Sequence, residues 1–475
     1  MITLPRNILL ILCTGLLTAC AVGPDYQRPD VNMGEHYRVG AEARDNDGWI
    51  QFRAQAPDPD TDWWTRFQDE ELNTMMDNML ADNFDLAAAE ARYRQARAAL
   101  QGARSGLFPT LDTSASLNRS GSGRPSLPQN QYSLSGDVRW APDLWGRVRR
   151  TMEGEAAGVD ASAADMAATR LSLQSTLAQT YFRLRLIDAE KSLLASTVNA
   201  YERNLSTVNN QFEAGISPRS DVAAATAQLE NARGQLQALS WQREQLANAL
   251  AVLQGLPPVK FSLSELDELT STAPVVPMGL PSELLQRRPD VVAAEHRVRQ
   301  ANAQIGVAQA AWFPDLTLSA QGGFRSGEWA RWLTAPAQFW SLGPALALTL
   351  FDGGARRART QEARASHEAQ AATYKQTVLD ALREVEDVLV ELDSLESEIQ
   401  TQHRATAAAE ESLRLTRNQY EAGIIDYLSV VQVETNALSA RRSLLSLEAD
   451  RLLLTAELIA ATGGDWTGLE TQENP

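Results

Sequence analysis

The spacing of apolar residues changes at two places in this chain, and both changes occur at a Phe-Pro pair. Before each pair, apolar and small residues recur three and four positions apart, which is the spacing of one face of an α-helix. After Phe108-Pro109 and after Phe313-Pro314, apolar residues occupy every second position, which indicates a strand. Proline ends a helix and is tolerated at the start of a strand. We therefore predict helix–strand junctions at Pro109 and Pro314.

A hairpin of two strands is expected after each junction. The predicted strands cover about residues 110–118 and 131–141 in the first hairpin, and about 315–325 and 341–351 in the second. Each strand has one apolar face, and these faces comprise Leu111, Ala115, Leu117, Tyr132, Leu134, Val138, Trp140, Leu316, Leu318, Ala320, Phe324, Leu342, Leu346, Leu348 and Leu350. In a soluble protein such a face packs on a helix or a second sheet, whereas in an outer membrane it contacts lipid. Aromatic residues near the strand ends favour the membrane.

A long stretch without proline follows each hairpin. Residues 144–212 and 353–420 contain few helix breakers, and a helix of about 65 residues is roughly 100 Å long. Return helices are predicted at about residues 221–253 and 427–461. The repeating unit therefore consists of a helix, a hairpin, a very long helix, a tight turn and a second helix.

Sequence similarity within the chain shows that this unit occurs twice. Residues 86–116 align without gaps on residues 291–321, and residues 210–222 align on residues 418–430 at nearly the same offset. Chance similarity between Ala-rich helices explains one match but not two at a shared offset. We therefore interpret the chain as two copies of one structural unit.

The N-terminus has the features of an export signal. Arg6 precedes an apolar run at residues 8–17, which is shorter than a membrane-spanning helix. The sequence Leu-Thr-Ala-Cys that ends at Cys20 resembles the bacterial lipobox, in which the cysteine is lipidated and becomes the first residue. Ala21, rather than Asp, favours export to the outer membrane by the same resemblance. The alternative is an ordinary signal peptide that contains a cysteine.

The following domain division results from these patterns. We expect a lipoprotein signal peptide at residues 1–19, a lipid-anchored extended tether at 20–64, a first repeat at 65–256, a linker or equatorial segment at 257–281, a second repeat at 282–462 and a tail at 463–475.

Composition excludes several classes of protein. The net charge of −17 argues against a nucleic-acid partner, because phosphate binding needs a basic face. The four histidines are scattered, so we expect no metal site, and no cofactor beyond the covalent lipid on Cys20. Of the two cysteines, Cys13 lies in the predicted signal peptide, which leaves no disulfide within the mature chain. No phosphate-binding loop, nucleophile elbow or Cys-x-x-Cys pattern is present, and we expect no catalytic residues and no enzyme.

Four strands cannot close a membrane barrel, since lipid-exposed sheet edges are not tolerated and single-chain barrels begin at about eight strands. Two chains would give eight strands, and three would give twelve strands with room for a lumen. The small polar residues opposite the apolar faces favour a lumen. The expected fold class is α+β with mainly long helices, in two tandem repeats per chain.

Several segments resemble the outer-membrane efflux protein family, the TolC-like outer membrane factors. They are CAVGPDYQRPD at residues 20–30, DLWGRVRR at 143–150, FDGGARRAR at 351–359, and the paired NQFEAGI and NQYEAGI. The lipobox points to the lipoprotein branch of multidrug efflux systems. This resemblance implies a homotrimer with a twelve-stranded transmembrane β-barrel in the outer membrane, continued by a periplasmic α-helical barrel. It also implies two partners, a periplasmic membrane-fusion adaptor and an inner-membrane pump, usually of the resistance-nodulation-division type.

The resemblance also places a gate at the periplasmic tips, near residues 213–222 and 421–430. Candidate gate residues are Asp426, Asp221 and Arg219, because threefold symmetry would repeat each as a ring of charge. The alternative is ordinary turn chemistry, since Asp221 and Asp426 are natural N-caps for the return helices.

The turn residues are Gly215, Ile216, Gly423 and Ile424, in which glycine supplies the left-handed helix cap and the surrounding turn contacts the adaptor. The predicted function is a passive outer-membrane conduit for drugs and other small toxic compounds. Two alternatives are a type I protein-secretion channel and a lipid-anchored coiled-coil scaffold without a pore.

Overall fold

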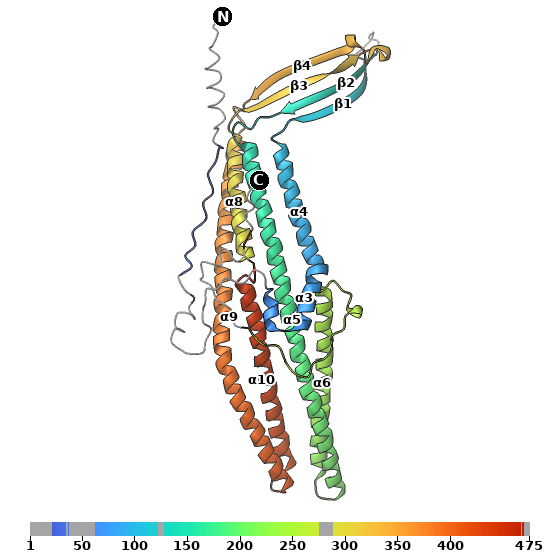
Figure 1. Ribbon diagram of the computed structural model, residues 1–475, viewed down its shortest axis with the longest axis vertical. Coiled ribbons are helices and arrows are strands. Elements are labelled where there is room, and N and C mark those ends of the chain that lie inside the picture. The colour runs from blue at the N-terminus through green and yellow to red at the C-terminus, as the bar shows by residue number, and fades with distance from the viewer. Residues whose placement is uncertain are drawn as a thin grey trace. The chain divides into compact units, whose positions relative to one another are not determined.

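The computed structural model (Figure 1) describes residues 21–34, 37, 62–121, 128–274, 288–466 and 468–469. The predicted signal peptide, Cys20 and much of the tether lie outside the described residues. The chain forms two compact units. The sheet unit comprises residues 1–30, 91–163 and 293–376, and the tip unit comprises residues 31–90, 164–292 and 377–475. Each unit takes segments from both sequence repeats.

The helices of the two repeats match in length, which confirms the tandem repeat. Both α4 (Phe84–Ser105) and α8 (Pro289–Ala310) have 22 residues; α5 (Arg147–Glu213) and α9 (Ala355–Glu421) have 67; α6 (Arg219–Leu253) and α10 (Tyr427–Ala461) have 35. The boundary between the two units passes through α4, α5, α8 and α9.

The two hairpins join into one antiparallel sheet in the order β1-β2-β3-β4 (Figure 1). The strands are β1 (Thr110–Ser120), β2 (Gln129–Trp140), β3 (Asp315–Ser326) and β4 (Gln338–Ala347). Register pairs Leu111 with Val138, and Leu134 with both Ala115 and Phe324. The predicted apolar residues of neighbouring strands therefore lie on one face of the sheet.

One strand differs from its predicted bounds. We expected the last strand at about residues 341–351, but β4 begins earlier and ends at Ala347, which leaves Leu348 and Leu350 outside it. The reason is the partner strand. Asp315, the first residue of β3, pairs with Ala347, and the residue before it is Pro314, which has no N–H to continue the ladder.

The core of the tip unit includes a segment that the sequence analysis assigned to the tether. Trp63 and Trp64 belong to a short 3-10 helix, η3 (Trp63–Phe67), and both are almost fully buried. They pack in one cluster with methionines of α3 (Glu70–Asp82) and with residues of α5, α9 and α10. Tyr37, which also lies in the predicted tether, belongs to the same cluster, so described residues of the segment assigned to the tether contribute to the core.

Buried charges hold the described part of the linker against the helices of the tip unit. Asp188 accepts hydrogen bonds from Arg185 at 2.9 Å and from Arg243 at 2.6 Å. The same two arginines donate to backbone oxygens, Arg185 to that of Ser264 at 2.7 Å and Arg243 to that of Leu263 at 2.6 Å. Because all three charged groups are buried and paired, they fix this segment in place.

The residues after Cys20 are held on the sheet unit by buried polar side chains. The Arg150 guanidinium donates to the backbone oxygen of Val22 at 3.1 Å, and the Asn302 amide donates to that of Pro24 at 3.0 Å. Glu295, also buried, accepts a hydrogen bond from the Tyr26 hydroxyl and forms an ion pair with Arg28. Hydrogen bonds and an ion pair from buried side chains therefore hold residues 22–28 on the sheet unit.

Candidate functional site

The long helices end in two turns of the same geometry. Gly215 and Gly423 have φ of 74° and 73°, in the left-handed region that favours glycine. The amide of Ile216 donates to Gln211 O, and that of Ile424 donates to Gln419 O, at 2.8 and 2.9 Å. These are the bonds of a Schellman cap. Both repeats therefore reverse direction by the same turn.

The turns expose their isoleucines. Ile216 is 76% exposed and Ile424 is 71% exposed. A side chain added at Gly215 or Gly423 would meet no atom within 4 Å in the chain, so these glycines are required by backbone conformation and not by close packing. Each turn therefore presents one exposed apolar side chain, Ile216 or Ile424, to its surroundings.

The candidate gate residues occupy three different settings. Asp426 is the N-cap of α10, and its carboxylate accepts hydrogen bonds from the backbone amide of Ser429 at 2.9 Å and from its hydroxyl at 2.6 Å. These bonds, led by the hydroxyl, lower the pKa of Asp426. Arg219 is the first residue of α6 and is exposed, and no ion pair involves it within the described part of the chain.

The expectation that Asp221 caps the first return helix is wrong. The N-cap of α6 is Pro218, which makes no side-chain cap hydrogen bond, and Asp221 lies in the first turn of the helix. The pKa of Tyr420 is raised by burial first and by the charge of Asp221 second. Asp221 therefore lies close enough to Tyr420 for its charge to contribute to this rise in the Tyr420 pKa.

Directly behind the turns, aromatic and aliphatic side chains form a small core. Val208, Ala225, Tyr427 and Val430 are buried there, one from each of α5 and α6 and two from α10. The Tyr420 ring on α9 lies 5.5 Å from the Tyr427 ring. Helices α5, α6, α9 and α10 thus meet in this core.

A buried carboxylate next to this core links the same four helices. Glu434 on α10 is 3% exposed. It accepts hydrogen bonds from Arg417 on α9 at 2.7 and 3.1 Å, and from the amides of Asn204 on α5 and Gln228 on α6, both at 3.2 Å. Sequence reasoning missed this network, because its members are far apart in the chain and follow no motif. We call Glu434, Arg417, Asn204 and Gln228 the Glu434 network.

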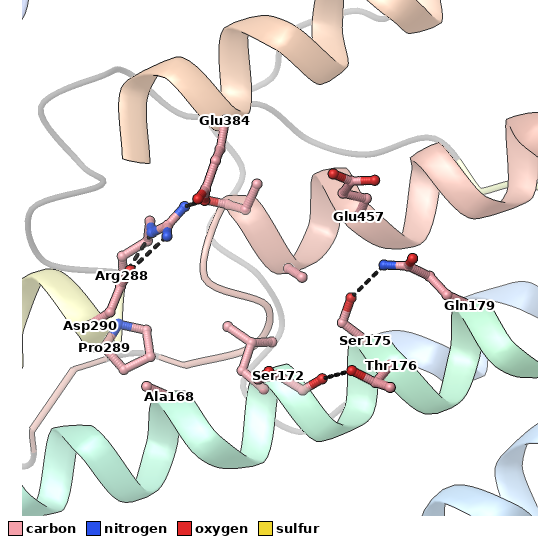
Figure 2. A pocket seen from close by; sticks show the side chains of 13 residues that line it. Ala168, Ser172, Ser175, Thr176, Gln179, Arg288, Pro289, Asp290, Glu384 and Glu457 are labelled. Carbon is pink, nitrogen blue, oxygen red and sulfur yellow. Dashed lines mark hydrogen bonds and ion pairs between the residues drawn. The ribbon is translucent and has the colours of Figure 1, made fainter. Parts of the chain in front are cut away.

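A cavity of about 500 Å³ lies elsewhere in the tip unit. Figure 2 shows Arg288 bound to Asp290 and Glu384 on one side of it, with Glu457 on α10. Ala168 and other small residues of α5 line the floor. The pKa of Glu457 is raised by burial and by the neighbouring charges of Glu391 and Glu384. Arg288 thus pairs with two of the three carboxylates that line the cavity, Asp290 and Glu384.

Two further properties of the described residues bear on function. Among the residues that the structure describes, no helix is long and apolar enough to cross a membrane. Within the same residues, no group of three or more histidine, cysteine or acidic side chains has the arrangement of a metal site.

Comparison with known proteins agrees with the geometry. The described residues combine a four-stranded sheet that has one apolar face with long helices that end in matched turns. The family model described as outer membrane efflux protein matches residues 75–256 and 280–464. The chain belongs to this family, and its activity is that of an outer-membrane efflux channel and not of an enzyme.

Individual relatives extend over nearly the whole chain. The cation efflux system protein CusC of Escherichia coli O6:H1 is 29% identical over 464 residues, which are 96% of this chain and 98% of the relative. The probable efflux pump outer membrane protein TtgC of Pseudomonas putida is 28% identical and covers 97% of this chain, with 95% of its own length matched. The solved open state of the MtrE outer membrane channel of Neisseria gonorrhoeae is 28% identical, with a TM-score of 0.82, and the match covers 95% of this chain and all of that one.

Proposed function

We propose that three copies of this chain form a closed twelve-stranded barrel in the outer membrane and act as the passive exit duct of an efflux system. The observation that carries this proposal is the sheet. In the described residues it has four strands, one apolar face and two edges, β1 and β4. A sheet in lipid must hydrogen-bond its edges, so β4 of one copy must meet β1 of the next.

The opposite face of the sheet suits the wall of an aqueous pore. It carries mainly serine, threonine and glutamine, and its serines bond across strands, with Ser114 and Ser135 at 3.1 Å and Ser116 and Ser133 at 2.6 Å. Small polar side chains that satisfy one another leave a lumen open. A dimer would have eight strands, whose interior side chains fill the space.

We place the gate of this duct at the helical tips. Threefold symmetry would bring three copies of Asp426 near the tip, together with Asp221 and Arg219, so that the constriction selects by charge. The Glu434 network would hold the closed arrangement, since it joins both helical pairs of one copy. The MtrE channel of Neisseria gonorrhoeae has been solved in an open state, which supports the proposal that a channel of this family can open.

The proposal extends to partners and to a lipid anchor. The exposed Ile216 and Ile424 at the turns fit a periplasmic adaptor, which would couple the duct to an inner-membrane pump of the resistance-nodulation-division type. Lipidation of Cys20 would anchor each copy. In support, Ala21 lies against Gly146 and the Val22 amide donates to Trp145 O, next to the end of β2.

The test is the oligomer mass of the purified lipidated protein combined with single-channel conductance in planar bilayers. We expect trimers with small cation-selective conductance steps. Asp426→Ala should enlarge the steps. Asp426→Asn, which keeps an N-cap side chain but removes its charge, should lower cation selectivity with less effect on step size. A monomer or dimer without conductance in every variant would refute the duct.

A further inference from the structure

The outer part of the sheet holds an arginine–aromatic pair on its polar face. Register pairs Phe339 with Gly323, and Arg325 follows on the same face. The Arg325 guanidinium carbon lies 4.6 Å from the centre of the Phe339 ring, which is the geometry of a cation–π contact. Both residues belong to the ends of β3 and β4 that are joined by their hairpin, away from the helices.

Phe339 is unusual for its face. Among the described strand residues that share this face, the others are polar, charged or small, and Phe339 is the one aromatic residue. Gly323 opposite it is enforced by packing, because a Cβ there would come within 2.0 Å of Leu134 O. A glycine across from an aromatic ring leaves room for the ring to lie over the backbone. The Phe339 ring can therefore pack against one side of the Arg325 guanidinium.

Arg325 is also separated from the other charges of this face. Asp112, Asp137, Arg139 and Asp315 occupy positions toward the helix-bearing ends of the strands. Three of these four are acidic, whereas the outer end carries Arg325. The face thus changes from net negative near the helices to positive near the hairpin ends.

We infer that Arg325, held against Phe339, sets the charge preference at the outer end of the pore and favours anionic over cationic solutes there. This inference rests on the proposed trimeric duct, in which three copies place three guanidinium groups around one lumen. Rings of arginine select anions in pores, and a lumen with low-dielectric walls strengthens the effect of each charge. Phe339 acts as a positioning residue, since it carries no charge itself.

The test is the reactivity of a single cysteine behind this ring in intact cells. Ser341→Cys lies on the polar face, next after Phe339 toward the helices, and Leu342→Cys lies on the apolar face as its matched control. Anionic and cationic methanethiosulfonate reagents are added outside, and the ratio of their reaction rates is measured. The chain without an introduced cysteine provides the blank for Cys20.

We expect Ser341→Cys to react and Leu342→Cys to react far more slowly. Adding Arg325→Gln should lower the anionic-to-cationic rate ratio about fivefold, a size consistent with three partly screened charges at an effective dielectric near 20. Phe339→Ala should lower the ratio in the same direction, and Phe339→Tyr should preserve it. Arg331→Gln, which removes an exposed arginine in the loop beyond the strands, should leave it unchanged.

The failures of the two proposals are distinguishable. Equal reactivity at positions 341 and 342 would refute the assignment of faces and with it the duct. A reactive Ser341→Cys whose rate ratio is unaffected by Arg325→Gln would refute the role of Arg325 and leave the duct standing.

Discussion

Truncation of one arginine tests whether the Glu434 network holds the helical tips together. Arg417→Ala removes two hydrogen bonds to Glu434, at 2.7 and 3.1 Å, and leaves a buried carboxylate with only two amide donors. Hydrogen bonds to a charged group contribute about 1.5–3 kcal/mol each. The Arg417 side chain is 45% exposed, so solvent screens its charge, and we expect a total loss of about 2 kcal/mol.

Hydrogen exchange measures this loss where it occurs. A decrease of about 2 kcal/mol in the free energy of local opening corresponds to roughly 30-fold faster exchange of the protected amides. We expect it in the helix ends that the network joins, near residues 204–213 and 417–434, with little change in the sheet unit.

Arg414→Ala is the matched control. Arg414 lies on the same helix, less than one turn away, and pairs with Glu411 in an exposed ion pair at 2.6 Å. Exposed pairs contribute little, so this variant should exchange like the wild-type protein. If Arg417→Ala and Arg414→Ala behaved alike, the Glu434 network would not be what stabilises the tips.

Three further changes have expected outcomes. Gly423→Val should destabilise the tip by about 1–3 kcal/mol, because its φ of 73° is strained for a β-branched residue, whereas Gly423→Asn should cost less; hydrogen exchange at the turn distinguishes them. Glu295→Ala should release residues 26–28 and lower the free energy of unfolding by about 3 kcal/mol, whereas Asp25→Ala, whose side chain is almost fully exposed, should have little effect on the melting temperature. Burial raises the pKa of Asp465 to about 6, above its value in the unfolded chain, so the folded state binds more protons between about pH 4 and 6 and loses stability as the pH rises through that range. Between pH 4 and pH 7, the free energy of unfolding should fall by about 2 kcal/mol less in the Asp465→Asn variant than in the wild-type protein. A pH dependence like that of the wild-type protein would contradict the assignment of this effect to Asp465.

Patterns among residues that are close together in the sequence predicted most of the fold. The equal lengths of α5 and α9 were foreseeable because proline is absent from both stretches, and the ends of these helices were foreseeable because Gly215 and Gly423 can take a positive φ. The end of β4 was not foreseeable from its own residues. Alternation continues to Leu350, but a strand ends where its partner stops pairing, and Pro314 stops β3.

The sequence did contain the information that corrects Asp221. When the two tip segments are aligned, Pro218 lies opposite Asp426, and Asp221 lies opposite Ser429. The structure follows this alignment, with Pro218 and Asp426 as the two N-caps. The preference of aspartate for N-cap positions suggested Asp221 as the N-cap of α6, whereas the alignment of the two repeats indicates Pro218. For a duplicated chain, alignment of the copies is therefore a better guide to local structure than cap preference.

The same alignment shows why the Glu434 network could not be found by looking for repeated features. The positions that correspond to Glu434 and Arg417 in the first repeat are Thr226 and Asn209. The buried ion pair thus belongs to α9 and α10 alone, while α5 and α6 contribute only the neutral amides of the network. The two helical pairs have the same lengths and turns but unequal roles. If the tips open by separating these pairs, the ion pair of Arg417 and Glu434 stays intact within the second pair, and only the two hydrogen bonds from neutral amides to the carboxylate break. Opening then costs less than separating the ion pair itself.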